Sequence, residues 1–132
     1  MAVDPKAFVD ESIADSEMPV VVFALEWCEF CWSVRKFFKK VGLDFRAIDL
    51  DSVEYQQDNL GQQIRTALTE RTSIKTIPQI FIGGELIGGC TEMFDAWKDG
   101  SAQLLLERLN IAYDKNSDAD PYAFLPQWLH PR

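Results

Sequence analysis

The residues best suited to chemistry are two cysteines, Cys28 and Cys31, which are separated by Glu29 and Phe30. A Cys-x-x-Cys pair holds two thiols close enough for one to attack a disulfide formed at the other. The reactive species is the thiolate, which the backbone N–H groups at the start of a helix stabilise. The same spacing also occurs in zinc sites, so the motif alone leaves redox chemistry and metal binding open.

The neighbouring sequence places this pair between a strand and a helix. Residues 20–25 are continuously apolar, as expected for a strand buried on both faces, and they end just before Cys28. Val34, Phe37, Phe38 and Val41 then recur at helical spacing before Gly42. This order places the thiols at the start of a helix.

A structural zinc site needs about four ligands. Outside the pair, the chain offers only Cys90 and the single His130, which form no second close pair. The order of strand, cysteine pair and helix therefore favours redox chemistry, and no metal site is expected. Two buried, inert cysteines are the alternative without chemistry.

The rest of the chain alternates helices and strands. The expected elements are a helix capped by Asp4, a strand at 45–50, a helix at 60–68, strands at 79–82 and 85–87, and short helices near 93–97 and 101–109. In the last helix we expect Leu104, Leu105 and Leu109 to face the core. This order predicts an α/β fold with a small mixed sheet and helices on both faces.

Two short segments add chemical signals. Pro78 directly precedes a strand, either as an ordinary strand-start proline or in a cis bond that turns the backbone of Ile77 outward. Gly88 and Gly89 lead into a helix whose free N–H groups could hold a carboxylate, with Thr91 adding a hydroxyl. The simpler interpretation of these glycines is a capped turn.

Taken together and in this order, the three segments resemble the glutaredoxin family. Residues 75–84 are especially similar to the family's proline segment and hairpin, and the resemblance covers residues 8–109. It implies a thioredoxin-like fold, with a four-stranded mixed sheet flanked by helices on both faces. It also implies a cis Ile77–Pro78 bond and glutathione as the thiol cosubstrate.

The resemblance further implies roles for individual residues. Cys28 would attack a glutathione mixed disulfide, and Cys31 or a second glutathione would then release the bound glutathione. Lys75 would meet the glycyl carboxylate, whose charge suits a cation. The implied glutathione-binding residues are Phe30, Lys75, Thr76, Ile77, Pro78, Gly89, Cys90 and Thr91.

The chain also departs from the family pattern. Leu25 stands where a lysine is usual, and Glu26 and Glu29 flank Cys28 with negative charge, which disfavours a thiolate. Glu29 replaces a common proline, and some glutaredoxins without it hold a [2Fe–2S] cluster between two protomers. The cations that could partly offset the glutamates lie on a helix face expected to be solvated: Arg35, Lys36, Lys39 and Lys40.

Composition indicates where the protein works. The 132 residues predict one domain at 1–110 followed by a tail at 111–132. A net charge of −8 disfavours duplex nucleic acid as a partner. An odd number of cysteines, an acidic N-terminus and the lack of a long apolar run predict a cytoplasmic protein that is neither exported nor in a membrane.

The tail is too apolar for a solvated linker, so we expect it to pack on the domain or to dock on a protein partner. Its apolar residues are Tyr122, Phe124, Leu125, Trp128 and Leu129, and His130 is expected at the surface.

The favoured function is a glutathione-dependent thiol–disulfide oxidoreductase that reduces protein–glutathione mixed disulfides, and protein disulfides through Cys31. Its expected partners are glutathione and glutathionylated or disulfide-containing proteins. The alternatives are a glutathione-assisted [2Fe–2S] carrier and a non-catalytic binding module that uses the tail and the surface around Trp27 and Trp32.

Overall fold

A computed structural model describes residues 3–126, so Trp128, Leu129 and His130 of the predicted tail lie outside the described residues. Four strands form one mixed sheet in the order β2-β1-β3-β4. Their bounds are β1 (Val20–Ala24), β2 (Arg46–Asp49), β3 (Gln79–Ile82) and β4 (Glu85–Gly88). The central strand β1 pairs in parallel with β2 and antiparallel with β3, which pairs antiparallel with β4. The predicted four-stranded mixed sheet is confirmed.

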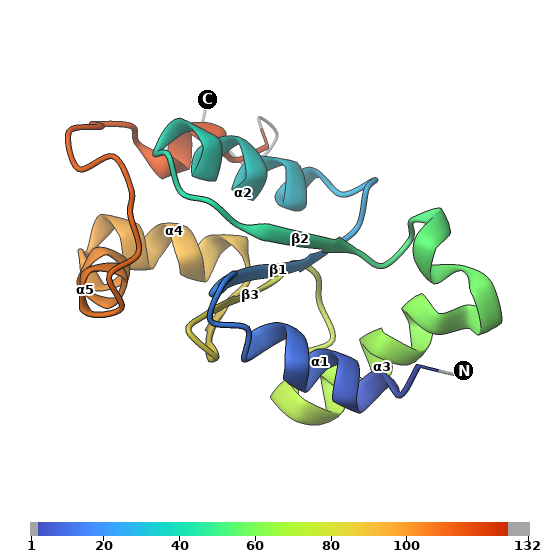
Figure 1. Cartoon of the computed structure of the whole chain (residues 1–132). Coiled ribbons are helices and arrows are strands. Elements are labelled where there is room, and N and C mark those ends of the chain that lie inside the picture. Colours follow the sequence, from blue (N-terminus) through green and yellow to red (C-terminus); the bar gives the residue numbers. More distant parts are fainter. Residues whose placement is uncertain (1–2, 127–132) are drawn as a thin grey trace.

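Helices cover both faces of this sheet (Figure 1). The α-helices are α1 (Pro5–Ile13), α2 (Glu29–Lys40), α3 (Leu60–Thr72), α4 (Cys90–Lys98) and α5 (Ser101–Arg108). Three short 3-10 helices are η1 (Val53–Tyr55), η2 (Gln57–Asn59) and η3 (Pro121–Phe124). α1 and α3 pack on one face of the sheet, whereas α2, α4 and α5 pack on the other.

Strand β1 shows why its sequence is apolar at every position. Side chains alternate between the two faces of a strand. Val20 and Val22 join the core under α2 and α4, whereas Val21 and Phe23 join the core under α1 and α3. All five residues of β1 are fully buried, so both faces need apolar side chains.

Two local predictions can be compared with the structure, the cap of α1 and the buried side of α5. Asp4 caps α1, because its side chain accepts the N–H of Lys6 at 3.1 Å, as predicted. The prediction for α5 was partly wrong, because Leu104 is 71% exposed and Leu109 is 40% exposed. Helix α5 instead turns its Ala102, Leu105 and Leu106 toward α4, and these three share one helical face.

The described part of the tail lies against α2 and α4. The ring of Phe124 meets the ring of Phe37 edge to face at 5.6 Å between centroids, and Tyr113 meets Trp97 at 5.5 Å. The hydroxyl of Tyr122 donates to the carboxylate of Asp95 at 2.5 Å. The tail therefore adds aromatic surface to the core on this side of the sheet. None of the helices within residues 3–126 has the length and apolar character needed to cross a bilayer.

Candidate redox site

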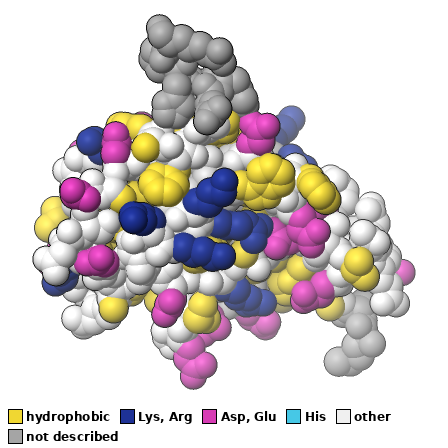
Figure 2. Space-filling view, turned by 90° about the horizontal axis from the view of Figure 1, so that it is seen from above, with side chains coloured by type: hydrophobic (Ala, Val, Ile, Leu, Met, Phe, Trp, Pro, Cys, Tyr) yellow, Lys and Arg dark blue, Asp and Glu magenta, His cyan; other side chains and the backbone are white. Residues whose placement is uncertain are grey.

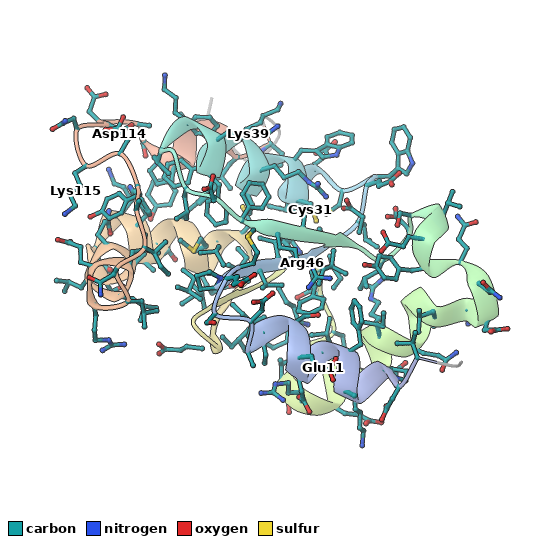
Figure 3. The ribbon with its side chains drawn as sticks, in the orientation of Figure 1. Glu11, Cys31, Lys39, Arg46, Asp114 and Lys115 are labelled. Atoms are coloured by element: carbon teal, nitrogen blue, oxygen red, sulfur yellow. The ribbon has the colours of Figure 1, made fainter. Side chains whose placement is uncertain are left out.

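The two thiols of the Cys-x-x-Cys pair differ in exposure. Cys28 is the N-cap residue of α2, with extended backbone angles of φ −143° and ψ 117°, and it is half-buried. Cys31 lies one turn later and is fully buried between α2 and the sheet (Figure 3). Both are free thiols. An incoming disulfide can reach Cys28, whereas Cys31 is accessible only from within the site.

Burial also sets the protonation of the inner thiol. Loss of solvent raises the pKa of Cys31 far above its ordinary value, and a hydrogen bond with Cys28 raises it further. A backbone hydrogen bond with Leu25 and the positive charge of Arg35 act in the opposite direction. At neutral pH Cys31 is therefore a protonated thiol beneath the accessible one.

Arg35 departs from the predicted solvated face of α2. Its side chain is only 25% exposed and forms an ion pair with Asp49 of β2. The other cations of the face remain exposed at Lys36, Lys39 and Lys40. Of the four cations on α2, Arg35 therefore lowers the pKa of the inner thiol Cys31, and the three lysines face solvent.

Asp51 holds the loop that carries Cys28. Its carboxylate accepts the N–H of Glu26 at 2.7 Å and the N–H of Trp27 at 3.5 Å. The indole N–H of Trp32 donates to the carbonyl of Glu26 at 2.6 Å from the other side. Asp51 was not identified from the sequence. The available signal was its position after β2, because segments that follow two adjacent parallel strands leave the sheet at the same edge.

The segment before β3 lies beside the accessible thiol. The Ile77–Pro78 bond is cis, as the family resemblance implied. The Cys28 sulfur lies 4.0 Å from the carbonyl oxygen of Ile77. The buried side chain of Gln79 braces this segment by donating to the carbonyl oxygens of Ile74 at 2.8 Å and Thr76 at 3.2 Å. Gln79 is a second positioning residue that sequence reasoning missed.

Arg65 of α3 lies close to the same segment. Its guanidinium donates to the carbonyl oxygen of Lys75 at 3.4 Å. The side chains of Lys75 and Thr76 are exposed. Two cations therefore flank the segment that runs toward Ile77, where the sequence had indicated only Lys75.

The start of α4 differs from the expected open N-terminus. The carboxylate of Glu92 accepts the N–H of Gly89 at 2.7 Å, so this N–H group is occupied by the helix's own side chain. A Cβ atom at Gly88 would lie 2.8 Å from the Cβ of Glu92, and Gly88 has a φ of +125°, so both space and backbone require glycine there. Thr91 is exposed.

Cys90, the first residue of α4, is 3% exposed. Burial raises its pKa to about 12, and the negative charges of Cys28 and Glu92 add to this. A thiol so strongly protonated fits the interpretation of an apolar filler.

Three distant segments thus meet at one place. Cys28, Phe30, Ile77 and Cys90 all pack on the same apolar cluster, under α2 and α4. Lys75, Thr76 and Thr91 lie at the surface around it. Within residues 3–126, no three His, Cys, Asp or Glu side chains lie close enough together to hold a metal ion.

Comparisons with known proteins agree with this architecture. Residues 20–87 match the family model described as glutaredoxin. Glutaredoxin-C6 of Oryza sativa subsp. japonica is 36% identical over 96 residues, which are 73% of this chain and 80% of that protein. Monothiol glutaredoxin-S10 of the same plant is 34% identical over 103 residues, which are 78% of this chain but only 59% of that protein.

A solved structure gives the same result. The buckwheat glutaredoxin–glutathione complex superposes with a TM-score of 0.72 at 31% sequence identity, and the match covers 82% of this chain and 93% of that chain. Sequence family, strand order and the position of the thiol pair at the start of α2 all agree, and the chain belongs to the glutaredoxin family.

Proposed function

We propose that this protein is a glutathione-dependent thiol–disulfide oxidoreductase that reduces protein–glutathione mixed disulfides. The observation that carries the proposal is the pairing of a half-exposed Cys28 at the N-cap of α2 with a buried Cys31 one turn below it. Cys28 is the thiol of the pair that an incoming disulfide can reach, so its sulfur is the nucleophile.

The reaction proceeds by two exchanges at Cys28. In the first, the Cys28 thiolate attacks the glutathione sulfur of a mixed disulfide, a new S–S bond forms, and the protein leaves as a thiolate. In the second, a glutathione thiolate attacks the glutathione sulfur on Cys28, which regenerates the Cys28 thiolate and releases glutathione disulfide. In the net reaction one glutathione thiol is oxidised and the protein sulfur of the mixed disulfide is reduced to a thiol, and the two glutathione units leave as glutathione disulfide.

Protein disulfides would follow a second route through Cys31. Here Cys28 forms a mixed disulfide with the substrate, and the Cys31 thiolate attacks the Cys28 sulfur, which forms a Cys28–Cys31 disulfide and releases the reduced protein. Two glutathione thiols then reduce the Cys28–Cys31 disulfide and leave as glutathione disulfide. The raised pKa of Cys31 keeps this thiolate scarce at neutral pH. We therefore propose that glutathione, rather than Cys31, completes most turnovers of glutathionylated substrates.

The surroundings of Cys28 suit glutathione, a tripeptide with two carboxylates. The guanidinium of Arg65 is bonded to the backbone carbonyl oxygen of Lys75, and these two residues provide positive charge for one carboxylate. The first-turn N–H groups of Cys90 and Thr91 have no partner within α4 and provide for the other carboxylate. The backbone of Ile77, next to Cys28, would lie along the cysteinyl unit. The matching buckwheat structure is a glutathione complex, which supports the same ligand here.

Phe30, Thr76, Pro78 and Gly89 complete the proposed site. Phe30 packs against the apolar cluster beside the thiols, and Pro78 is buried behind Ile77. The N–H of Gly89 is already taken by Glu92, so Gly89 contributes the turn rather than a hydrogen bond to glutathione. We further propose a cytosolic location, where a reducing environment keeps the thiols free, and a division into a domain at 1–110 and a tail at 111–132.

The test is a glutathione-coupled assay of mixed-disulfide reduction on wild type, Cys28→Ser and Cys31→Ser. We expect Cys28→Ser to lose all turnover and Cys31→Ser to keep most of it. Activity that survives in Cys28→Ser would contradict the proposal. The rival cluster carrier is tested by the visible absorbance of protein purified without oxygen in the presence of glutathione, and we expect none.

A further inference from the structure

The exposed face of α2 is basic in an otherwise acidic protein. The chain has 21 Asp and Glu residues against 13 Lys and Arg residues. Lys36, Lys39 and Lys40 are all exposed on α2, and the ion pairs formed within residues 3–126 involve other Lys and Arg side chains. Figure 2 shows Lys and Arg side chains gathered on the face of the molecule that is seen from above, with large hydrophobic side chains beside them.

The lysines continue a row that begins at the redox thiol. Residues four apart lie on the same side of a helix, so Trp32, Lys36 and Lys40 follow one another from the N-cap residue Cys28. Twelve residues of α-helix span about 18 Å. A segment bound along this row would therefore lie within about 18 Å of the mixed disulfide.

Two tryptophans lie at the start of α2, with Trp32 between the N-cap Cys28 and Lys36 along the helix. Trp27 is 82% exposed and Trp32 is 39% exposed, and their rings meet edge to face at 6.3 Å between centroids. The hydrogen bond from the Trp32 indole to the carbonyl of Glu26 holds this pair in place. Exposed, rigid aromatic side chains are typical anchors of protein interfaces.

We propose that Trp27, Trp32, Lys36, Lys39 and Lys40 form a docking surface, the α2 row, for an acidic segment of the protein substrate. This inference rests on the proposed function, because it names the class of protein whose mixed disulfide Cys28 receives. The aromatic pair contacts the chain beside the modified cysteine, and the lysines contact carboxylates farther along. An extended segment advances about 3.3 Å per residue, so the carboxylates lie about three to six residues from the cysteine.

The charge of the whole molecule strengthens the selectivity of this surface. A net charge of −8 repels an acidic partner on average, whereas the three exposed lysines of the α2 row concentrate positive charge on one helix face. The approach that brings an acidic segment to the lysines also brings its cysteine to Cys28. A nucleic acid is disfavoured, because its long run of phosphates would extend beyond three lysines onto acidic surface.

The test compares two glutathionylated peptides that differ only three to six residues from the cysteine, where one has glutamates and the other glutamines. We expect wild type to show a kcat/KM about fivefold to tenfold higher for the glutamate peptide at low ionic strength, falling toward parity at high salt. The triple variant K36Q/K39Q/K40Q should bring this ratio close to one. The matched control K6Q/R108Q/K115Q removes the same charge elsewhere and should keep the wild-type ratio.

Three outcomes would overturn the inference. Equal kcat/KM values for the two peptides in wild type would show that the α2 row does not select acidic segments. An equal loss of selectivity in both triple variants would show that the preference for the glutamate peptide depends on net charge alone. Inhibition by a short RNA duplex that disappears in K36Q/K39Q/K40Q would assign the lysines to nucleic acid. Absence of turnover with either peptide would instead contradict the proposed function.

Discussion

The sulfur of Cys28 lies 4.0 Å from the carbonyl oxygen of Ile77, a residue 49 positions later in the chain. This contact joins the start of α2 to the segment before β3. The side chains of Gln79 and Arg65 donate hydrogen bonds to backbone carbonyl oxygens of that segment. In the proposed complex, a peptide bound along the backbone of Ile77 would have its sulfur next to Cys28.

The two buried thiols should make the fold less stable in alkali. Burial raises the pKa of Cys90 from 9.0 to about 12 and raises that of Cys31 from the same value. Above pH 9 the unfolded chain releases thiol protons that the folded protein retains, so the free energy of unfolding falls as pH rises. Each thiol contributes a slope of up to about 1.4 kcal/mol per pH unit.

Urea unfolding of wild type and Cys90→Ala between pH 8 and about 10.5 measures this effect. We expect the decline to be shallower in Cys90→Ala, while the exposed neighbour variant Thr91→Ala keeps the wild-type slope. Equal slopes of unfolding free energy against pH for Cys90→Ala and wild type would show that burial does not raise the pKa of Cys90.

Arg35 should assist the exchange that uses Cys31. Its positive charge lowers the pKa of Cys31 against the effect of burial, so Arg35→Gln should raise that pKa further. The release of glutathione from glutathionylated Cys28 by Cys31 should then slow by about threefold or more at pH 8, since it depends on the scarce thiolate. Rapid-quench mass spectrometry of the single turnover measures the rate, which should also rise with pH in both proteins.

The control for this experiment is Lys115→Gln, which removes a cation far from the thiols, next to Glu107. Its release rate should equal that of wild type. If Arg35→Gln slowed release by added glutathione as strongly as release by Cys31, the effect would not act through the inner thiol.

Asp51 should keep the loop before Cys28 ordered. Asp51→Ala removes the acceptor for the N–H groups of Glu26 and Trp27, and we expect a loss of about 1 kcal/mol in unfolding free energy. Hydrogen exchange at the Glu26 amide should speed up by about fivefold, in proportion to that loss. Asp51→Asn keeps an acceptor oxygen and should be affected less, and the exposed Asp118→Ala should resemble wild type. Unchanged exchange in Asp51→Ala would contradict this role.

The tail should stabilise the domain through Phe124. This side chain is half-buried against Phe37, and Phe124→Ala should cost about 2 kcal/mol, roughly half the usual cost for a fully buried phenylalanine. The melting temperature should fall by several degrees in a thermal scan. The control Leu104→Ala removes a side chain that is 71% exposed, so it should change the melting temperature little. Equal melting temperatures for Phe124→Ala and wild type would show that this contact adds no stability.

Much of the fold followed from local patterns. The apolar run before Cys28, the glycines at 83 and 84 between two strands, and Asp4 before Pro5 each describe an element through its own residues. The exposure of Leu104 was not predicted, because which side of a short helix is covered depends on the angle at which it meets its neighbour.

The supporting residues of the candidate site were harder to predict. Asp51, Gln79 and Arg65 act through hydrogen bonds to backbone groups of other segments. Glu92 occupies the N–H of Gly89, which the sequence had suggested was open. The contacts of Asp51 and Arg65 depend on which segments the fold brings together, and no local pattern encodes that. The contacts of Gln79 and Glu92 are local, and Glu92 is the third residue of α4, which is the capping-box position.

The sequence by itself determined that this protein carries a thiol pair at the start of a helix, with a proline before a strand and a glycine turn before another helix. Only the tertiary structure decided which thiol is accessible, that Arg35 lies by the inner one, and that three lysines remain on the outer face of α2. The physical reason is burial, because access to solvent controls both the charge of a thiol and the reach of a lysine, and burial depends on how distant segments pack.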